Sequence, residues 1–296
     1  MEVVGFVGLG RMGSKMAENI AKRYKTVVWN RTVEKAVELS SKGAEAASSP
    51  ADLARRSSII ISMLATPNAT ADVILGRGQY RGAGLSDGLS AGKVVVDMST
   101  NSPSTVQMLA KELGAKGVNF LDAPVMGSVQ AASEGSLTIL ASGDSSAFNR
   151  VLPVLETLGK RVWYLGDVGT ASKLKIILNL HLWLLTASFA EAFMLAKRAG
   201  IDPKTALEIW NSSNQRTYVS ETKGPKILAE DFKAAFTVEL ALKDMKLVSE
   251  LADEIGFPLY LGEVVKELYK SCQSLGLSDQ DFAAITKLYD LLSGKR

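Results

Sequence analysis

The sequence predicts an α/β protein with an N-terminal doubly wound sheet, a long interdomain helix and an all-α C-terminal domain. Three observations predict this class. Short apolar runs alternate with amphipathic stretches in the first half, a glycine-rich segment follows the first run, and strand-like alternation disappears after Leu165. A chain of 296 residues also suits two domains of ordinary size. We therefore expect domains at 1–165 and 166–296.

Short runs in the first half have the composition of strands. They are rich in β-branched residues, and several are apolar throughout, as parallel strands covered on both faces are. Between them, Ser49-Pro50 and Ser102-Pro103 each place a capping serine before a proline at the first helical position. This alternation predicts a parallel sheet. The expected strands are Val3–Val7, Thr26–Trp29, Ile59–Met63, Val94–Met98, Phe120–Ala123 and Leu137–Ala141.

The second half contains helical patterns only. Residues 172–198 include neither glycine nor proline and end before Gly200, so they predict one long helix. Its apolar face continues through Leu184, Leu185, Phe189 and Met194, which is more than a small helical domain needs. We therefore expect a homodimer or homotetramer. Further helices are expected at Pro203–Trp210, Thr237–Ile255, Leu261–Ser274 and Asp279–Leu292.

Composition excludes several classes of function. Hydrophobic residues make up 47% and charged residues 22%, which is typical of a globular protein and excludes disorder for most of the chain. With 34 basic and 31 acidic residues, the charge is too balanced for a nucleic-acid partner. The single cysteine, Cys272, excludes an intrachain disulfide and a thiolate zinc cluster, and the single histidine, His181, disfavours a histidine metal site or a Ser–His triad.

The sequence favours a cytoplasmic protein without a membrane partner. Glu2 stands where a signal peptide would be basic, and glycines interrupt the first apolar segment. The richest apolar stretch, Ile176–Ala190, contains Asn179 and His181 and is flanked by lysines and a glutamate. A spanning helix needs about 20 apolar residues with few polar ones, so we interpret this stretch as a buried helix of a soluble domain.

The segment Gly8–Gly13 fits the pattern G-x-G-x-x-G and stands between an expected strand and an expected helix. In a Rossmann-type domain, Gly8 would permit the tight turn, Gly10 would let the backbone approach a pyrophosphate, and Gly13 would let the helix pack closely. The helix N-terminus would offer N–H groups to the phosphates. The alternative is an ordinary glycine-rich turn, but the strand–helix context favours a dinucleotide site.

The end of the second strand predicts a preference for NADP, with NAD bound more weakly. Proteins specific for NAD place an acidic residue about 20 positions beyond the first glycine, where it holds the ribose 2′-hydroxyl. This chain instead has Asn30, Arg31 and Thr32. An arginine can form a fork of hydrogen bonds to a 2′-phosphate. The alternative is that Arg31 is only a solvated surface cation.

Lys175 and Asn179 share one face of the long helix, because they are four residues apart. Polar groups within an otherwise apolar helix need partners, and a cleft with a polar substrate would supply them. Partial burial would also lower the pKa of a lysine and permit proton transfer near neutral pH. Alternatively, Lys175 extends to solvent from the start of the helix. The residues themselves leave both interpretations open.

Four motifs follow one another along the chain: Phe6–Gly13, Asp122–Ser128, Gly169–Asn179 and Lys243-Asp244. In this order, and over almost the whole chain, they resemble the β-hydroxyacid dehydrogenase family, which includes 3-hydroxyisobutyrate dehydrogenase and the glyoxylate/succinic semialdehyde reductases. The resemblance implies NAD(P)-dependent oxidoreductase activity without a metal.

The resemblance also implies a role for each matched position. Lys175 matches the catalytic general acid/base, and Asn179 matches the residue that orients the substrate. Substrate contacts are implied for both of these and for Ser99, Met126, Gly127, Ser128 and Asp244, where N–H groups of the Gly127-Ser128 backbone would hold a carboxylate. Cofactor contacts are implied for Gly8, Leu9, Gly10, Arg11, Met12, Gly13, Asn30, Arg31, Thr32, Met63, Leu64, Pro67, Thr100 and Lys243.

The implied reaction is reversible hydride transfer between the nicotinamide and a small 3-hydroxy acid, such as 3-hydroxyisobutyrate or L-serine. The alternative is NADPH-dependent reduction of a small aldehyde such as glyoxylate or succinic semialdehyde. Met126 stands where the family often has serine, and this replacement of a hydroxyl by a thioether leaves the substrate open. A non-catalytic cofactor-binding scaffold and an imine reductase are disfavoured because such relatives are expected to lack the lysine.

Overall fold

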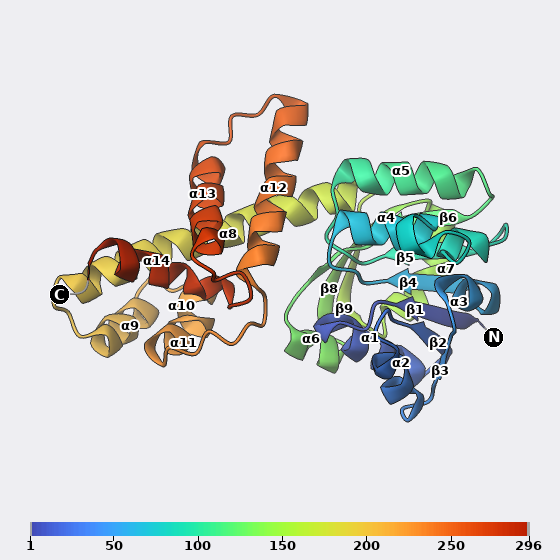
Figure 1. Ribbon diagram of the computed structural model, residues 1–296, viewed down its shortest axis with the longest axis horizontal. Coiled ribbons are helices and arrows are strands. Elements are labelled where there is room, and N and C mark those ends of the chain that lie inside the picture. Colours follow the sequence, from blue (N-terminus) through green and yellow to red (C-terminus); the bar gives the residue numbers. More distant parts are fainter. Residues whose placement is uncertain (1, 295–296) are drawn as a thin grey trace. The chain divides into compact units, whose positions relative to one another are not determined.

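A computed structural model describes residues 2–294 and divides the chain into two compact units, Met1–Lys175 and Ile176–Arg296. We call them the α/β unit and the helical unit (Figure 1). The division follows Lys175, whereas the sequence predicts it after Leu165. The reason is local, because the first turn of the long helix is hydrogen-bonded to the sheet through Asp122 and Ser142.

The α/β unit is built on a nine-stranded sheet with the order β3-β2-β1-β4-β5-β6-β8-β7, in which β9 pairs with β8. The pairs from β3 to β6 are parallel, and β8 is antiparallel to both β6 and β7. The strands are β1 Val3–Val7, β2 Lys25–Trp29, β3 Ala44–Ala46, β4 Ile59–Ser62, β5 Val94–Asp97, β6 Asn119–Asp122, β7 Val125–Met126, β8 Leu137–Gly143 and β9 Gly159–Tyr164.

All of the expected strands are present, and the doubly wound fold is confirmed. The sequence did not predict β3 and β7, which are only three and two residues long, or β9, whose residues are mostly exposed. A strand that is short or exposed leaves no apolar run to detect.

The apolar strands are explained by cover on both faces of the sheet. In β4, Ile59 and Ile61 pack into one core cluster, whereas Ile60 packs into another on the opposite face. Successive side chains of a strand point to opposite faces, so a strand in the middle of such a sheet must be apolar at every position.

Seven helices and two short 3₁₀ turns connect the strands. Ser49 and Ser102 accept hydrogen bonds from Asp52 N and Thr105 N, so both predicted Ser-Pro helix starts are confirmed. The helices are α1 Arg11–Ala21, α2 Val33–Ser40, α3 Pro50–Arg56, α4 Pro67–Leu75, α5 Pro103–Gly114, α6 Val129–Glu134 and α7 Ser145–Leu155, and the 3₁₀ turns are η1 Gly78–Tyr80 and η2 Leu85–Asp87.

The helical unit is assembled along α8, Thr170–Arg198, whose first residues belong to the α/β unit. Figure 1 shows α12 and α13 side by side in this unit, and side chains of both helices lie in its hydrophobic core. Its further elements are α9 Pro203–Ser212, α10 Tyr218–Thr222, α11 Gly224–Leu228, α12 Val238–Ile255, α13 Tyr260–Ser274, η3 Phe282–Ala284 and α14 Ile285–Leu292. The last predicted helix therefore begins later than expected, because Asp281 caps the short η3 turn instead of continuing a helix from Asp279.

Within the part of the chain that the structure describes, α8 is the one helix long and apolar enough to cross a bilayer by length and composition. Its Trp183, Ala187 and Ala190 lie in the core of the helical unit, as the side chains of a core helix do. Phe189 and Met194 are also buried in this unit, against Phe193, Leu207 and Val219. Those two residues therefore do not form the free apolar face that the sequence predicts, and the exposed apolar residues of α8 are Ile177, Leu178 and Leu195.

Candidate functional site

The glycine loop connects β1 to α1 in the α/β unit. Gly8 has a φ of +95°, which favours glycine, and a Cβ at Gly13 would collide with the carbonyl oxygen of Gly8. The turn and the close approach of the helix thus depend on these two glycines, in the way the sequence predicts.

Gly10 differs from the other two glycines because its surroundings are open. A Cβ at Gly10 would meet no protein atom within 4 Å, and its φ of −72° is allowed for any residue. Gly10 is also the N-cap of α1, and no side chain caps this helix. The helix start therefore leaves N–H groups and space for an outside group, which fits a bound pyrophosphate.

Asn30 braces the glycine loop from the end of β2. Its Oδ1 accepts a hydrogen bond of 2.9 Å from Leu9 N, and its Nδ2 donates to Thr32 O over 3.0 Å. Arg31 and Thr32 follow at the exposed start of α2. The asparagine thus shapes the loop, and Arg31 remains the cation that solvent or a 2′-phosphate can reach.

The ends of β4 and β5 carry the loops predicted to run along the cofactor. Ser99 is 1% exposed; its hydroxyl donates to Asp97 Oδ1 over 2.7 Å and accepts from Leu64 N over 2.8 Å. This hydroxyl therefore holds the two loops together, and the substrate contact that the resemblance implies for Ser99 stays a prediction. Thr100 is half-buried beside it, and Met63 packs against the core. Pro67 is the first residue of α4.

The buried carboxylate of Asp97 holds these loops in place. It accepts hydrogen bonds from Ser62 Oγ at 2.7 Å and from Asn101 Nδ2 at 2.6 Å, in addition to Ser99. Burial raises the pKa of Asp97, and these hydrogen bonds oppose that effect.

The segment predicted to hold the substrate lies beside the predicted catalytic lysine. Lys175 Nζ is 3.2 Å from Met126 Sδ, so the thioether and the amine are in contact. The next residues are exposed: Gly127 has a φ of +140°, and Ser128 caps α6 by accepting from Ala131 N. The structure therefore brings Lys175 next to the Met126–Ser128 turn, although Met126 lies 49 residues earlier in the sequence.

Asn179 lies one turn beyond Lys175 on α8, and within the helical unit its side chain is held by Asp244. Asn179 Nδ2 donates to Asp244 Oδ2 over 2.6 Å, and the carboxylate is fully buried. Lys243 Nζ lies 2.9 Å from Asp244 Oδ1. The two groups form an ion pair, but their geometry is not that of a hydrogen bond. Asp244 thus supports the side chain of Asn179, and the substrate contact that the resemblance implies for Asp244 stays a prediction.

Two further residues occur only once each in the sequence, a histidine and a cysteine. His181 is exposed on α8. Cys272 is buried in the core of the helical unit, and burial raises the pKa of its thiol to about 11, which suppresses the reactive thiolate. Among the described residues there is no group of three or more histidine, cysteine or acidic side chains that could hold a metal ion.

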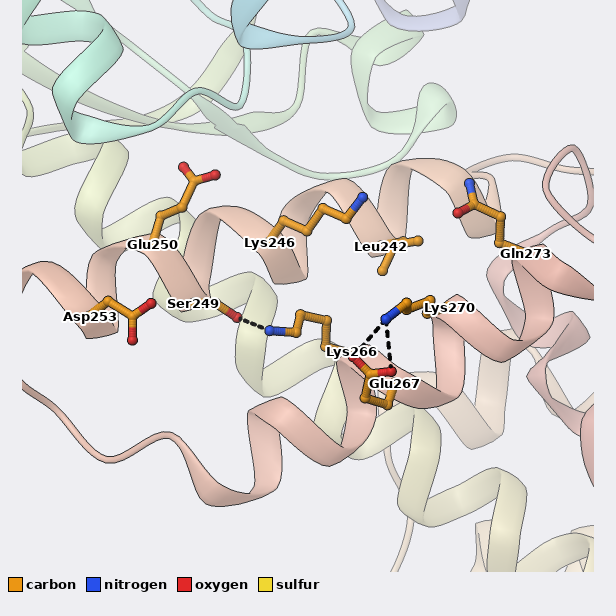
Figure 2. Close-up of a pocket in the computed structure, with 9 residues that line it drawn as sticks. All are labelled: Leu242, Lys246, Ser249, Glu250, Asp253, Lys266, Glu267, Lys270 and Gln273. Carbon is orange, nitrogen blue, oxygen red and sulfur yellow. Dashed lines mark hydrogen bonds and ion pairs between the residues drawn. The ribbon is translucent and has the colours of Figure 1, made fainter.

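A groove of about 390 Å³ lies between α12 and α13 (Figure 2). Lysines and carboxylates line it in mixture, and Lys266 Nζ donates to Ser249 Oγ over 3.0 Å. None of the predicted site residues lines this groove, and its alternating charges are those of a solvated helix surface.

Sequence reasoning assigned no role to three buried polar residues that support the site, Asp97, Ser142 and Asp122, although Asp122 begins the Asp122–Ser128 motif. Each lies in or at the end of a strand, and Asp97 and Asp122 are direct partners in the β5–β6 register. The available signal was an aspartate that ends an apolar strand, since the carboxyl ends of parallel strands are where such sheets bind ligands.

Two family models together match most of the chain and meet between residues 166 and 169. Residues 3–166 match a family model described as the NAD binding domain of 6-phosphogluconate dehydrogenase. Residues 169–289 match one described as the NAD-binding domain of NADP-dependent 3-hydroxyisobutyrate dehydrogenase.

Individual relatives cover nearly the whole chain. Glyoxylate/succinic semialdehyde reductase 1 of Arabidopsis thaliana is 35% identical over 95% of this chain and 96% of its own length. The cytokine-like nuclear factor N-PAC of Xenopus tropicalis is also 35% identical over 97% of this chain, which spans about half of that protein. A crystal structure of 3-hydroxyisobutyrate dehydrogenase from Salmonella typhimurium superposes with a TM-score of 0.89 at 28% identity, covering 97% of this chain and all of that one.

Proposed function

Because the chain belongs to the β-hydroxyacid dehydrogenase family, we propose that it transfers hydride reversibly between NADP and a small 3-hydroxy acid, with Lys175 as the general acid/base. The observation that carries the proposal is the contact between Lys175 Nζ and Met126, in the segment that matches the family's substrate-binding motif. The relative N-PAC is named as a nuclear factor and not as an enzyme, so catalysis has to be assigned on a residue of this chain. Lys175 is the residue that favours an enzyme here.

The cofactor would lie along the carboxyl edge of the parallel strands. The open space at Gly10 and the uncapped start of α1 fit its pyrophosphate, and exposed Arg31 fits a 2′-phosphate. When bound, the nicotinamide supplies or accepts the hydride. Leu64 and Thr100 would border it, because Ser99 and Asp97 fix their loops.

Lys175 would move the proton. In the oxidation direction, neutral Nζ accepts the proton of the substrate hydroxyl; in the reduction direction, the ammonium donates it to the forming alkoxide. Asn179 would orient the substrate through its side-chain amide, which Asp244 holds in place through one N–H of Nδ2. The Gly127 and Ser128 backbone would hold the acid group, since Met126 provides no hydroxyl.

The substrate would be a small 3-hydroxy acid such as 3-hydroxyisobutyrate or L-serine. Reduction of glyoxylate or succinic semialdehyde is a second candidate, which the Arabidopsis relative favours by its name. Absorbance of NADPH in both directions, across a panel of 3-hydroxy acids and these two aldehydes, distinguishes them. Activity with none of the panel would contradict the proposal.

The role of Lys175 is tested by Lys175→Ala beside Lys173→Ala as a matched control. Lys173 is exposed, and it lies two positions away on a different face of α8. We expect Lys175→Ala to lower kcat by about 10²–10⁴-fold, which is the usual contribution of general acid–base catalysis. NADP affinity should stay unchanged in both variants. Turnover in Lys175→Ala equal to that of the control would exclude Lys175 as the acid/base.

The cofactor preference is tested by Arg31→Asp, with exposed Arg23→Asp as its control. A charge-assisted contact contributes about 1.5–3 kcal/mol, so the ratio of kcat/KM for NADP over NAD should fall at least tenfold in Arg31→Asp. The ratio should stay constant in Arg23→Asp. An unchanged ratio in both would remove Arg31 from the cofactor site.

We also propose a homodimer or homotetramer. Exposed Ile177, Leu178 and Leu195 on α8 support it, although the apolar face differs from the one that the sequence predicts. Light scattering coupled to size-exclusion chromatography gives the mass directly, and a monomer at all concentrations would contradict the proposal.

A further inference from the structure

Asp122 connects the sheet to the start of α8. It is the last residue of β6 and is fully buried. Its Oδ1 accepts hydrogen bonds from Gly169 N at 2.9 Å and Ser142 Oγ at 2.6 Å, and its Oδ2 accepts from Ser172 N at 2.9 Å. One carboxylate thus receives two backbone N–H groups from the start of a helix that begins 48 residues later at Thr170.

Ser142 of β8 completes this arrangement. Its hydroxyl donates to Asp122 and accepts from Ala171 N over 3.0 Å. The first N–H groups of a helix have no partner within the helix, and capping usually comes from the residue just before it. At α8, two side chains from the sheet supply the capping instead. Two backbone N–H groups at the N-terminal, positive end of a 29-residue helix thus point at the Asp122 carboxylate.

We infer that Asp122 and Ser142 are positioning residues, which fix Lys175 against the substrate-binding turn. Lys175 lies one turn beyond Ser172. The orientation of the first turn therefore sets the position of the Lys175 Cα and the direction in which its side chain leaves the helix. Asp122 also begins the segment that leads through Met126 to Gly127 and Ser128. Asp122 therefore links the helix start that carries the base to the segment that carries the turn, in which Met126 Sδ lies 3.2 Å from Lys175 Nζ.

The inference rests on the proposed function for its catalytic consequence, but the clamp itself can be measured without activity. Asp144 offers a matched control in the same unit. Its Oδ1 accepts from Ala147 N over 2.8 Å and so caps α7, which carries none of the residues proposed for the site. Asp122→Ala and Asp144→Ala therefore both remove a helix cap, whereas the lysine is displaced only in the first.

The experiment compares Asp122→Asn, Asp122→Ala and Ser142→Ala with Asp144→Ala. We expect kcat to fall about 10–100-fold in Asp122→Ala, because a displacement of about 1 Å has that effect on a reacting group. Asp122→Asn keeps one acceptor oxygen, and Ser142→Ala keeps the carboxylate, so both should lose less. KM for NADP should stay within twofold in every variant, and Asp144→Ala should keep its kcat.

Hydrogen exchange of the peptide that covers residues 169–175 provides the second readout, measured on the cofactor-bound full chain. Its amides should exchange faster in both Asp122 variants and in Ser142→Ala, but not in Asp144→Ala. Should Asp122→Ala not fold, Asp122→Asn and Ser142→Ala still test the clamp.

Faster exchange together with a kcat no lower than that of the control would show a cap without a positioning role and would overturn the inference. Unchanged exchange would overturn the clamp itself. If Lys175→Ala kept full turnover, the proposed function would fail, and the exchange result would still decide whether Asp122 holds α8.

Discussion

The two units bury carboxylates in different surroundings. In the α/β unit, Asp97 and Asp122 are held by hydroxyls, an amide and backbone N–H groups, and no ion pair of either is found in the described part of the chain. In the helical unit, Asp281 is bound by the ammonium of Lys223 at 2.7 Å, and Asp244 lies beside Lys243.

The difference follows from where free backbone donors occur. Loops and helix starts gather at the carboxyl edge of a parallel sheet, and their N–H groups can solvate a buried charge. Within packed helices nearly all N–H groups are used by the helix itself, so Asp281 has a cation in addition to two backbone N–H groups, and Asp244 has a cation and a side-chain amide. In the α/β unit, the polar groups that support the site therefore use backbone donors. In the helical unit, Asp244 supports Asn179 through a side-chain amide, and the Lys223–Asp281 pair joins other elements.

The largest effect is expected from Lys223→Met, which breaks the ion pair of the helical unit. Both partners are buried, and Asp281 would keep the N–H groups of Ala235 and Ala283 but lose its cation. The free energy of unfolding should fall by about 3–5 kcal/mol, because an uncompensated buried charge costs that much. Urea unfolding followed by tryptophan fluorescence measures it.

Lys270→Met is the control for this variant, since the Lys270–Glu267 pair is exposed. It should cost less than about 1 kcal/mol. Equal losses in the two variants would contradict the view that the helical unit depends on a paired cation.

Gly13→Ala tests whether the α/β unit depends on close backbone packing. The added methyl group would collide with the Gly8 carbonyl, so we expect a loss of about 1–3 kcal/mol in stability.

Gly10→Ala is the matched variant on the same loop. It has open space in the protein and should keep its stability, while NADP affinity should fall about tenfold because the methyl group would occupy the position proposed for the phosphates. Calorimetry and NADP titration separate the two, and a reversed pattern would contradict the site geometry.

Asp244→Asn tests the buried carboxylate that serves the proposed site within the helical unit. It should leave Asn179 without its anionic acceptor and lower kcat about tenfold, with KM for NADP unchanged. Glu239→Gln is a control on the same helix, because Glu239 is exposed in its first turn. A normal kcat in Asp244→Asn would remove the support role of Asp244.

The smallest effect is expected in the pH dependence of stability at Asp97. The folded state raises the pKa of this carboxyl above its unfolded value. The folded form therefore binds the proton more tightly, and the wild type should lose stability relative to Asp97→Asn as pH rises through the raised pKa. The pKa of Asp144 is lowered by hydrogen bonds from the Ser146 hydroxyl and from Ala147 N, so the wild type should lose stability relative to Asp144→Asn as pH falls, which is the opposite sign. Unfolding midpoints of the wild type and the two variants, measured across the acid range, test this prediction. It would be refuted if the stability difference from wild type changed in the same direction with pH for Asp97→Asn and for Asp144→Asn.

The sequence predicted the sheet, the long helix and the order of the motifs because these depend on local pattern. Apolar runs, Ser-Pro helix starts and the spacing of Lys175 and Asn179 can all be recognised without knowledge of distant residues. The roles of Ser99 and Asp244 could not be predicted in the same way, because each depends on a partner far along the chain. Ser99 accepts from Leu64 N, 35 residues earlier, and Asp244 holds Asn179, 65 residues earlier.

The sequence by itself thus determined the α/β-then-helical organisation, the glycine loop and the lysine one turn from an asparagine. Only the tertiary structure decided which polar side chains face a ligand and which hold the loops and helix that do. Asp122 illustrates the reason. Its partners lie on α8 and β8, and hydrogen-bond partners that are distant in sequence meet only when the sheet has closed.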